Sequence, residues 1–248
     1  MNQFLINDII IDMSQEIGGE LSIWTGDVAD PDKWRERRIG IGITAPCPAF
    51  CRFCERNQDL RKGLGTINFP KDELVKNIIE AVGGKKGQVE FVLTGGIVGE
   101  PLLKGVHYLK GIITTVKSTY PDSTIRLNTI GNILNLQQSE TLINELKEAG
   151  LDRVAISLNA TNKQDYDYLC RPKEEGNFEN ALEFIEASLK ILGSENTIVS
   201  FVNYDDHPKA PSDWPIFSKE KANELLLPMG VSKDNIILRD YIPVGKNK

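Results

Sequence analysis

Residues 38–54 read Arg-Ile-Gly-Ile-Gly-Ile-Thr-Ala-Pro-Cys-Pro-Ala-Phe-Cys-Arg-Phe-Cys. Three isoleucines, Ile39, Ile41 and Ile43, alternate with small residues, and this period of two predicts a β-strand. The strand is followed after a short gap by three cysteines in the spacing C-x3-C-x2-C. The segment therefore predicts a strand whose C-terminal end carries a cysteine-rich loop.

The cysteine spacing indicates a metal centre. Of the four cysteines in the chain, Cys47, Cys51 and Cys54 fall within eight residues, which in a reduced protein favours thiolate ligands over disulfides. A closed zinc site needs four ligands, commonly from two C-x2-C pairs, and the chain has no second pair. Three thiolates on a cubane iron–sulfur cluster leave one iron open to a small molecule. We interpret the loop as part of an active site; a non-catalytic zinc or iron–sulfur redox-sensing module is the alternative.

Alternating strand and helix patterns continue to the end of the chain. Further strands are expected at 89–93, 124–129, 153–159, 197–203 and 235–242, and helices at 70–82, 105–119, 139–149, 177–192 and 218–227. Six β-then-α units predict a parallel sheet with right-handed crossovers. Six strands are too few for an eight-stranded barrel, so we predict an α/β fold, an open partial (β/α)6 TIM-type barrel forming a single domain over 38–248. Residues 1–37 are expected to be an N-terminal extension that packs on the barrel, as strand or short helix.

A second motif, Thr-Gly-Gly-Ile-Val-Gly-Glu-Pro at residues 94–101, follows the second expected strand. Glycines suit tight strand-to-helix turns, and a plain turn explains this stretch on its own. A carboxylate in such a turn can instead pair with an ammonium group, which makes Glu100 a candidate ligand-binding residue.

The two motifs together resemble those of the radical SAM superfamily. Its hallmark, C-x3-C-x-Φ-C with an aromatic Φ, is matched by Cys47, Cys51, Phe53 and Cys54, and its Gly-Gly-Glu-Pro motif is matched in part by Gly99, Glu100 and Pro101. The resemblance implies a [4Fe–4S] cluster on the three cysteines, S-adenosylmethionine (SAM) as the second cofactor, Glu100 on its amino group and Phe53 near its adenine. It implies reductive cleavage of SAM to a 5′-deoxyadenosyl radical, which abstracts hydrogen from an unidentified small-molecule or peptide substrate.

Polar residues at the ends of later strands are further candidates. By the same resemblance, Asn128, Ser157 and Asn159 are expected at the nucleoside hydroxyls, with helix capping or turn formation an equal alternative. The fourth cysteine, Cys170, is either a buried small hydrophobe or a thiol that donates hydrogen to a substrate radical. The stretch 157–172 also resembles the small radical SAM proteins associated with TatD-type nucleases.

Two surface features suggest how the site is reached. The proline-rich loop at 203–217 is expected to be a lid or specificity loop, or simply a surface excursion. Arg52, Arg56, Arg61 and Lys62 form a basic patch around the cysteines. This patch is expected to bind a substrate anion or to dock an acidic electron donor such as flavodoxin or ferredoxin.

Composition limits the remaining classes. The 248-residue chain has a net charge of −6, which gives no strong case for a nucleic-acid partner. No apolar stretch approaches the roughly 20 residues that span a bilayer, and the N-terminal segment lacks the basic residues of a secretory signal. Clustered reduced cysteines fit a cytoplasmic location.

Overall fold

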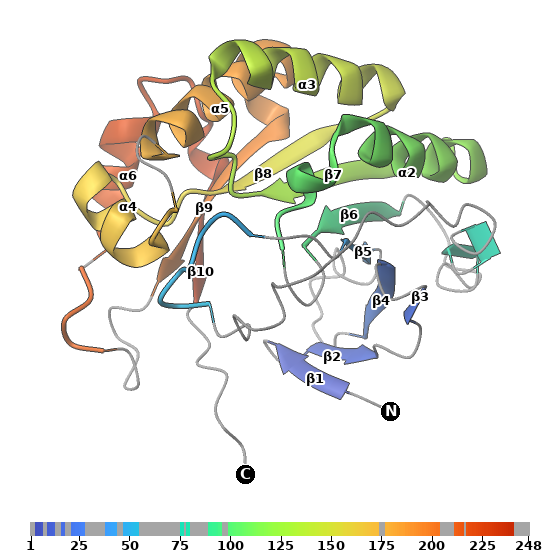
Figure 1. The fold of residues 1–248 in the computed structure, drawn as a ribbon, viewed down its shortest axis with the longest axis horizontal. Coiled ribbons are helices and arrows are strands. Elements are labelled where there is room, and N and C mark those ends of the chain that lie inside the picture. Colours follow the sequence, from blue (N-terminus) through green and yellow to red (C-terminus); the bar gives the residue numbers. More distant parts are fainter. Residues whose placement is uncertain are drawn as a thin grey trace. The chain divides into compact units, whose positions relative to one another are not determined.

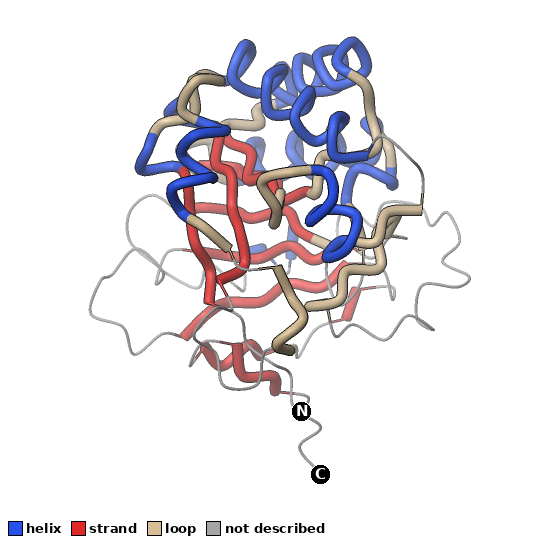
Figure 2. Tube along the Cα trace, turned by 90° about the vertical axis from the view of Figure 1, so that its left-hand side faces the viewer, coloured by secondary structure: helices blue, strands red, loops and turns tan. Residues whose placement is uncertain are grey.

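The computed structural model describes residues 3–6, 9–12, 16–17, 21–27, 38–43, 47–54, 75–76, 78–79, 89–95, 99–173, 177–203, 211–215 and 217–240. The chain divides into two compact units. The first comprises Met1–Cys47, Asp59–Thr129 and Asn144–Arg153, and the second comprises Pro48–Gln58, Ile130–Ile143 and Val154–Lys248. Figure 1 labels their elements, and Figure 2 distinguishes helices, strands and loops.

The first unit contains an antiparallel group of strands followed by a parallel group. The antiparallel strands are β1 (Gln3–Ile6), β2 (Ile9–Asp12), β3 (Glu16–Ile17) and β4 (Leu21–Asp27), and β4 pairs antiparallel with β5 (Arg38–Ile43). From β5 the pairing is parallel, through β6 (Glu90–Thr94) to β7 (Thr124–Thr129). The N-terminal extension, for which strand and short helix were both expected, therefore forms strands in its described residues.

The register of the parallel strands sorts their side chains onto two faces. Ile39 lies beside Phe91, which lies beside Ile125, and all three are fully buried. The next residue on each strand points to the opposite face, as strand geometry requires. Helix α2 (Val106–Thr119) adds a buried apolar stripe of Leu109, Ile112, Ile113 and Val116, and it runs alongside β6 and β7 in Figure 1.

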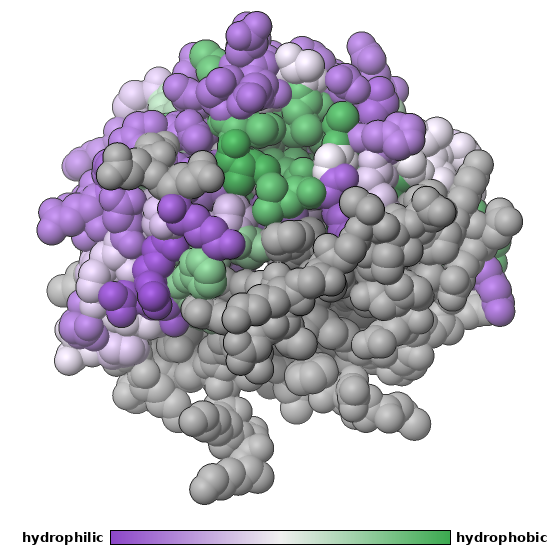
Figure 3. Space-filling view, viewed as in Figure 1, coloured by the Kyte–Doolittle hydropathy of each residue, from purple (hydrophilic) through white to green (hydrophobic). Residues whose placement is uncertain are grey.

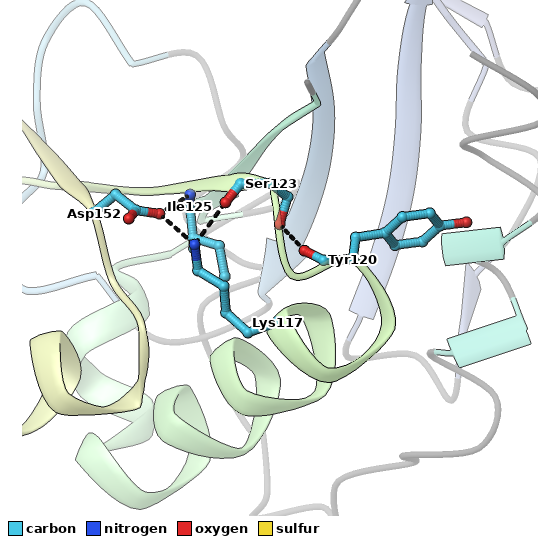
Figure 4. A network of polar contacts seen from close by, with 5 residues as sticks. All are labelled: Lys117, Tyr120, Ser123, Ile125 and Asp152. Atoms are coloured by element: carbon cyan, nitrogen blue, oxygen red, sulfur yellow. Dashed lines mark hydrogen bonds and ion pairs between the residues drawn. The ribbon is translucent and has the colours of Figure 1, made fainter. Parts of the chain in front are cut away.

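A polar network joins the end of α2 to the start of β7 (Figure 4). Lys117 Nζ donates to the Ser123 carbonyl at 2.6 Å and pairs with Asp152 Oδ2 at 2.9 Å. The same carboxylate oxygen accepts from the Ile125 backbone N–H at 2.7 Å. Lys117, Ser123 and Asp152 border an open cavity of about 830 Å³ near the N-terminal ends of the strands. The network thus ties α2, β7 and the segment after α3 (Leu136–Ala149) together.

The second unit repeats the strand-then-helix order. Its strands β8 (Arg153–Ser157), β9 (Thr197–Asn203) and β10 (Ile236–Asp240) pair in parallel. Its helices are α4 (Lys163–Cys170), α5 (Asn177–Leu192) and α6 (Lys219–Leu226). It also contains the short 3-10 helices η4 (Ser194–Asn196) and η5 (Lys233–Asn235). A further short 3-10 helix, η3 (Pro101–Lys104), belongs to the first unit. Outward-facing side chains of the helices are mostly hydrophilic, drawn purple in Figure 3, with a smaller green hydrophobic area.

The α/β fold with six parallel strands, β5 to β10, agrees with the prediction from the sequence. Most boundaries agree to within one residue; β10 is described only to Asp240, and two others differ by more than one residue. α3 begins at Leu136 rather than 139, because the Asn135 side chain accepts the Gln138 N–H at 3.0 Å and caps the helix there. β8 ends at Ser157 rather than 159, because Asn159 has a left-handed φ of 61°. Of the helix expected at 70–82, only 75–76 and 78–79 are described, and both pairs are helical.

In the part of the chain that the structure describes, no helix is long and apolar enough to cross a membrane.

Candidate active site

The cysteine loop is held by main-chain bonds to the end of α4, within the second unit. The backbone N–H of Phe50 donates to the Cys170 carbonyl at 3.0 Å, and the backbone N–H of Arg52 donates to the Leu169 carbonyl at 2.8 Å. Helix C-termini leave their last carbonyls without partners inside the helix, so the loop satisfies acceptors that α4 cannot. The helix ends at Arg171, whose φ of 47° turns the chain back along the loop.

The three cysteines of this loop are half-buried and are not joined in disulfides. The Cys54 N–H donates to the Cys51 carbonyl at 3.0 Å, which closes a turn between these two cysteines. Among the described residues, no three side chains of the ligand types converge as they would on a single metal ion. The donor set nevertheless fits a cubane iron–sulfur cluster, because three partly accessible thiols in eight residues supply the sulfur ligands that it needs.

Arg52 fastens the same loop through its side chain. Its Nε donates to the Tyr168 carbonyl at 2.8 Å, and its guanidinium lies 4.2 Å from the centre of the Tyr168 ring. The Tyr168 hydroxyl donates to the Asp213 carboxylate, and this hydrogen bond is the main reason that the pKa of Tyr168 is raised. Tyr168 and Asp213 were not among the candidate site residues, although they lie in the 157–172 stretch and the 203–217 loop that the sequence singled out. The other members of the predicted basic patch, at 56, 61 and 62, lie outside the described residues.

Phe53 contacts the described part of the loop that was expected to be a lid. Its ring meets the Trp214 ring edge-on, with centroids 6.5 Å apart and an interplanar angle of 74°. Together with the bond between Tyr168 and Asp213, this contact fixes residues 211–215 against the cysteine loop and α4. Residues 204–210 and 216 lie outside the described residues.

In the first unit, Glu100 is a buried carboxylate, 1% exposed, at the start of η3. Its Oε1 accepts from the Leu102 N–H at 3.1 Å and from the Thr129 hydroxyl at 2.6 Å. Two donors to one oxygen fix the side-chain orientation. The sequence pointed to Glu100 but not to Thr129, which lies at the end of the neighbouring strand.

The turn before Glu100 depends on two glycines. A Cβ built on Gly95 would lie 1.8 Å from the Gly99 carbonyl oxygen, so no larger residue fits at position 95 without displacing the turn. Gly99 has a φ of 136°, a conformation that favours glycine. The glycines of this motif therefore serve the turn, which in turn places the Glu100 carboxylate.

The strand-end residues of the second unit lie close together. Arg239 Nη2 donates to Ser157 Oγ at 3.2 Å, and Asn159 Nδ2 donates to the Ser157 carbonyl at 3.2 Å. Asn159 Oδ1 is buried and has no hydrogen-bond partner among the described residues, as is also true of Asn128 Oδ1 in the first unit. A buried acceptor without a donor is rare in a folded protein and fits a site that a ligand hydroxyl completes.

Cys170 is 2% exposed at the end of α4, and its carbonyl receives the Phe50 N–H. This burial is what a packing role requires.

The family model for the radical SAM superfamily matches residues 41–208, a stretch that begins in β5 and includes the cysteine loop, Glu100 and α4. The chain belongs to the radical SAM superfamily. This family uses a [4Fe–4S] cluster and SAM, so membership supports an enzyme rather than a non-catalytic binding module.

Curated relatives of this radical SAM chain include GTP 3′,8-cyclases. A probable GTP 3′,8-cyclase of Pyrococcus abyssi is 34% identical over 129 residues, which are 52% of this chain and 36% of the relative. The GTP 3′,8-cyclase of Petrotoga mobilis is 30% identical over 156 residues, which are 62% of this chain and 43% of the relative. The matched region thus spans less than half the length of these relatives.

Solved structures support the radical SAM fold. Native anSMEcpe with bound AdoMet matches with a TM-score of 0.52 at 16% identity, over 80% of this chain and 50% of that one. The FeFe-hydrogenase maturase HydG from Carboxydothermus hydrogenoformans matches with a TM-score of 0.54 at 17% identity, over 80% and 43%. The predicted partial barrel is therefore confirmed as the fold.

Proposed function

We propose that this chain cleaves SAM reductively and uses the resulting radical to abstract hydrogen from a substrate. The observation that carries the proposal is the loop with Cys47, Cys51 and Cys54, three partly exposed cysteines outside any disulfide, on a backbone fastened to α4. These thiols would hold the [4Fe–4S] cluster. When bound, the cluster supplies an electron and an open iron for the methionyl end of SAM.

The remaining site residues would bind and orient SAM. Glu100 would pair with the methionyl ammonium, because Thr129 and the Leu102 N–H hold its carboxyl group in a fixed orientation. Gly99 and Pro101 shape the turn around it. By the family resemblance, Asn128, Ser157 and Asn159 would contact the ribose hydroxyls, and Phe53 would pack near the adenine. Within its own unit, each of Asn128 Oδ1 and Asn159 Oδ1 is a buried acceptor that a hydroxyl could satisfy.

The proposed reaction balances as a one-electron reduction. One electron from the cluster would let SAM supply methionine, with the electron pair of the broken C5′–S bond on sulfur, and a 5′-deoxyadenosyl radical. That radical would take a hydrogen atom from the substrate, which would give 5′-deoxyadenosine and a substrate radical. A buried Cys170 thiol as hydrogen donor to that radical remains a second, separate proposal, which its 2% exposure disfavours.

The substrate and the electron donor are proposed only as chemical classes. The GTP 3′,8-cyclases act on GTP. For this chain the proposed substrate is a small molecule or a peptide. The electron would come from an acidic carrier such as flavodoxin or ferredoxin, for which exposed Arg52 offers a cationic contact. Free thiols that must stay reduced favour a reducing compartment such as the cytoplasm.

The test is SAM turnover under strict anoxia. Reconstituted protein is incubated with SAM and dithionite, and the nucleosides are separated by chromatography. We expect 5′-deoxyadenosine that depends on both dithionite and Cys47, with Cys170→Ala as the matched cysteine control. S-adenosylhomocysteine as the sole product, or intact SAM beside a demonstrably reduced cluster, contradicts the proposal.

A further inference from the structure

β7 presents a polar face beside the residues already described. Its buried residues Ile125, Leu127 and Thr129 share one face, and Arg126 and Asn128 lie on the other. Residues two apart on a strand are about 7 Å apart and point the same way. Arg126 is therefore the next side chain below Asn128, toward the N-terminal end of the strand.

Arg126 is a buried cation with incomplete compensation. Its side chain is 12% exposed, and its Nη2 lies 3.6 Å from Glu90 Oε2, an oxygen that also binds Arg38 Nε. Its own Nε is buried and has no hydrogen-bond partner within the described part of the chain. Burial lowers the pKa of Arg126; Glu90 opposes this effect and Arg153 adds to it. Since one carboxylate serves two guanidinium groups, an additional anion would be favourable beside Arg126.

Strand β5, which lies beyond β6 from β7, carries glycine at two positions of this face. In the parallel register, Gly40 of β5 lies beside Val92, which lies beside Arg126, and Gly42 lies beside Thr94. Glycine inside a strand weakens it and often marks a place where a ligand or another backbone approaches closely. Because Gly40 and Gly42 are two residues apart, the side chains that both positions lack would have pointed to the face that carries Arg126.

We propose that Arg126 is a specificity-determining residue that binds an anionic group of the radical SAM substrate, a carboxylate or a phosphate. A guanidinium can donate two parallel N–H groups to a carboxylate or a phosphate. Arg126 Nε has no hydrogen-bond partner among the described residues and could donate to such an anion. The inference rests on the proposed function, since it assumes that Asn128, one step along the strand, faces the nucleoside of SAM. The substrate anion would then lie one side-chain step deeper than that nucleoside.

The experiment measures anion binding to the cluster-loaded, SAM-bound protein. Inorganic pyrophosphate and malonate are the phosphate and carboxylate probes, titrated at constant ionic strength, and the readout is the probe-dependent rise in melting temperature with its apparent Kd. Arg126→Gln should weaken binding about tenfold or more, as loss of a charged hydrogen bond does. Glu90→Gln should instead tighten it, because the competing carboxylate charge is removed. Lys190→Gln, which breaks a surface ion pair with Glu140, is the matched charge control and should change nothing.

If Arg126 binds the anion, the Arg126 and Glu90 variants should change the apparent Kd of the probe in opposite directions. If the two residues have only a structural role, both variants should change it in the same direction. A preference for pyrophosphate assigns a phosphate, a preference for malonate assigns a carboxylate, and binding of both supports the shared chemistry. Failure of both probes to stabilise the wild type, or equal binding by Arg126→Gln, overturns the inference. The 5′-deoxyadenosine assay on the same samples separates the two proposals, because loss of SAM cleavage in the wild type contradicts the proposed function instead.

Discussion

The Thr129 hydroxyl donates to the Glu100 carboxylate over 2.6 Å, which links the end of β7 to the turn after β6. Both residues are buried, with exposed fractions of 4% and 1%. A short bond from a neutral donor to a buried carboxylate is stronger than one at the surface, because less water competes for either partner. The position of Glu100 is therefore set by a residue 29 positions away in sequence.

Replacing Thr129 by Val keeps the shape and removes this donor. Glu100 would retain the Leu102 N–H but lose its fixed orientation, so we expect the Kd for SAM to rise by about three- to tenfold, as loss of about 1 kcal/mol implies. Equilibrium dialysis with SAM measures the change. Thr115→Val is the matched control, since the Thr115 hydroxyl is equally buried but bonds the Gly111 carbonyl of its own helix. Equal effects of both substitutions would contradict the role of Thr129.

Glu100→Gln tests the charge itself. The amide keeps an acceptor for Thr129 and Leu102 but loses the negative charge, so SAM affinity should fall about tenfold or more, the value of a charge-assisted bond of 1.5–3 kcal/mol. Iron content should stay at the wild-type level. Unchanged SAM binding in the folded, iron-loaded variant would assign the ammonium contact to another residue.

The cluster ligands are tested by iron and sulfide analysis. Cys47→Ala, Cys51→Ala and Cys54→Ala should each abolish or sharply reduce iron loading, because a three-thiolate site has no spare ligand. Cys170→Ala should load fully and lose only packing. Full iron and sulfide in a triple Cys47, Cys51 and Cys54 variant would exclude these residues as the ligands.

The pKa of Tyr168 provides a pH test. The bond to Asp213 stabilises the protonated phenol in the folded state, so its pKa lies above the ordinary value of about 10. The stability that this bond adds is complete below that ordinary value and is lost as the pH rises through the higher folded pKa. The phenolate absorbance of the wild type minus that of Tyr168→Phe, measured against pH, should show Tyr168 ionising at a higher pH than an ordinary tyrosine. Asp213→Asn should move this ionisation to lower pH. A Tyr168 step that Asp213→Asn leaves in place would contradict the assignment.

Gly150→Ala tests the network of Figure 4. An added Cβ would lie 2.8 Å from Lys117 Cγ, at a φ of 113°, whereas Gly193 has a φ of 84° with nothing within 4 Å. Backbone strain should cost both alanine variants about 1–3 kcal/mol of unfolding free energy. The steric contact should cost Gly150→Ala roughly 1 kcal/mol more. Urea unfolding gives both values, and equal losses would show that Lys117 moves aside freely.

The order of strands and helices followed from local patterns. Alternation in 124–129 and the apolar spacing in 177–192 gave the bounds of β7 and α5, because each element buries one face along its length. Two ends were misplaced, since the Asn135 cap and the left-handed Asn159 depend on single side chains or torsions that periodicity does not register.

Only the candidate site residues that belong to a sequence motif could be predicted from the sequence. The cysteines and Glu100 stand in recognisable spacings, whereas Thr129, Tyr168 and Asp213 act through partners 29 to 45 residues away. Arg126 read as an ordinary polar position of a strand. Its significance comes from sharing Glu90 with Arg38, which requires the register of β5, β6 and β7.

The main-chain ladder between the cysteine loop and α4 makes the loop tolerant of sequence change. Because Phe50 and Arg52 are anchored through their backbone N–H groups, substitution of their side chains leaves those bonds in place. Positions 50 and 52 are therefore suitable sites for directed evolution, where charge and bulk beside the candidate ligand cysteines can be varied, although a change at Arg52 also removes its side-chain bond to the Tyr168 carbonyl. A library limited to these positions would tune the electronic surroundings of the thiolates without redesigning the scaffold.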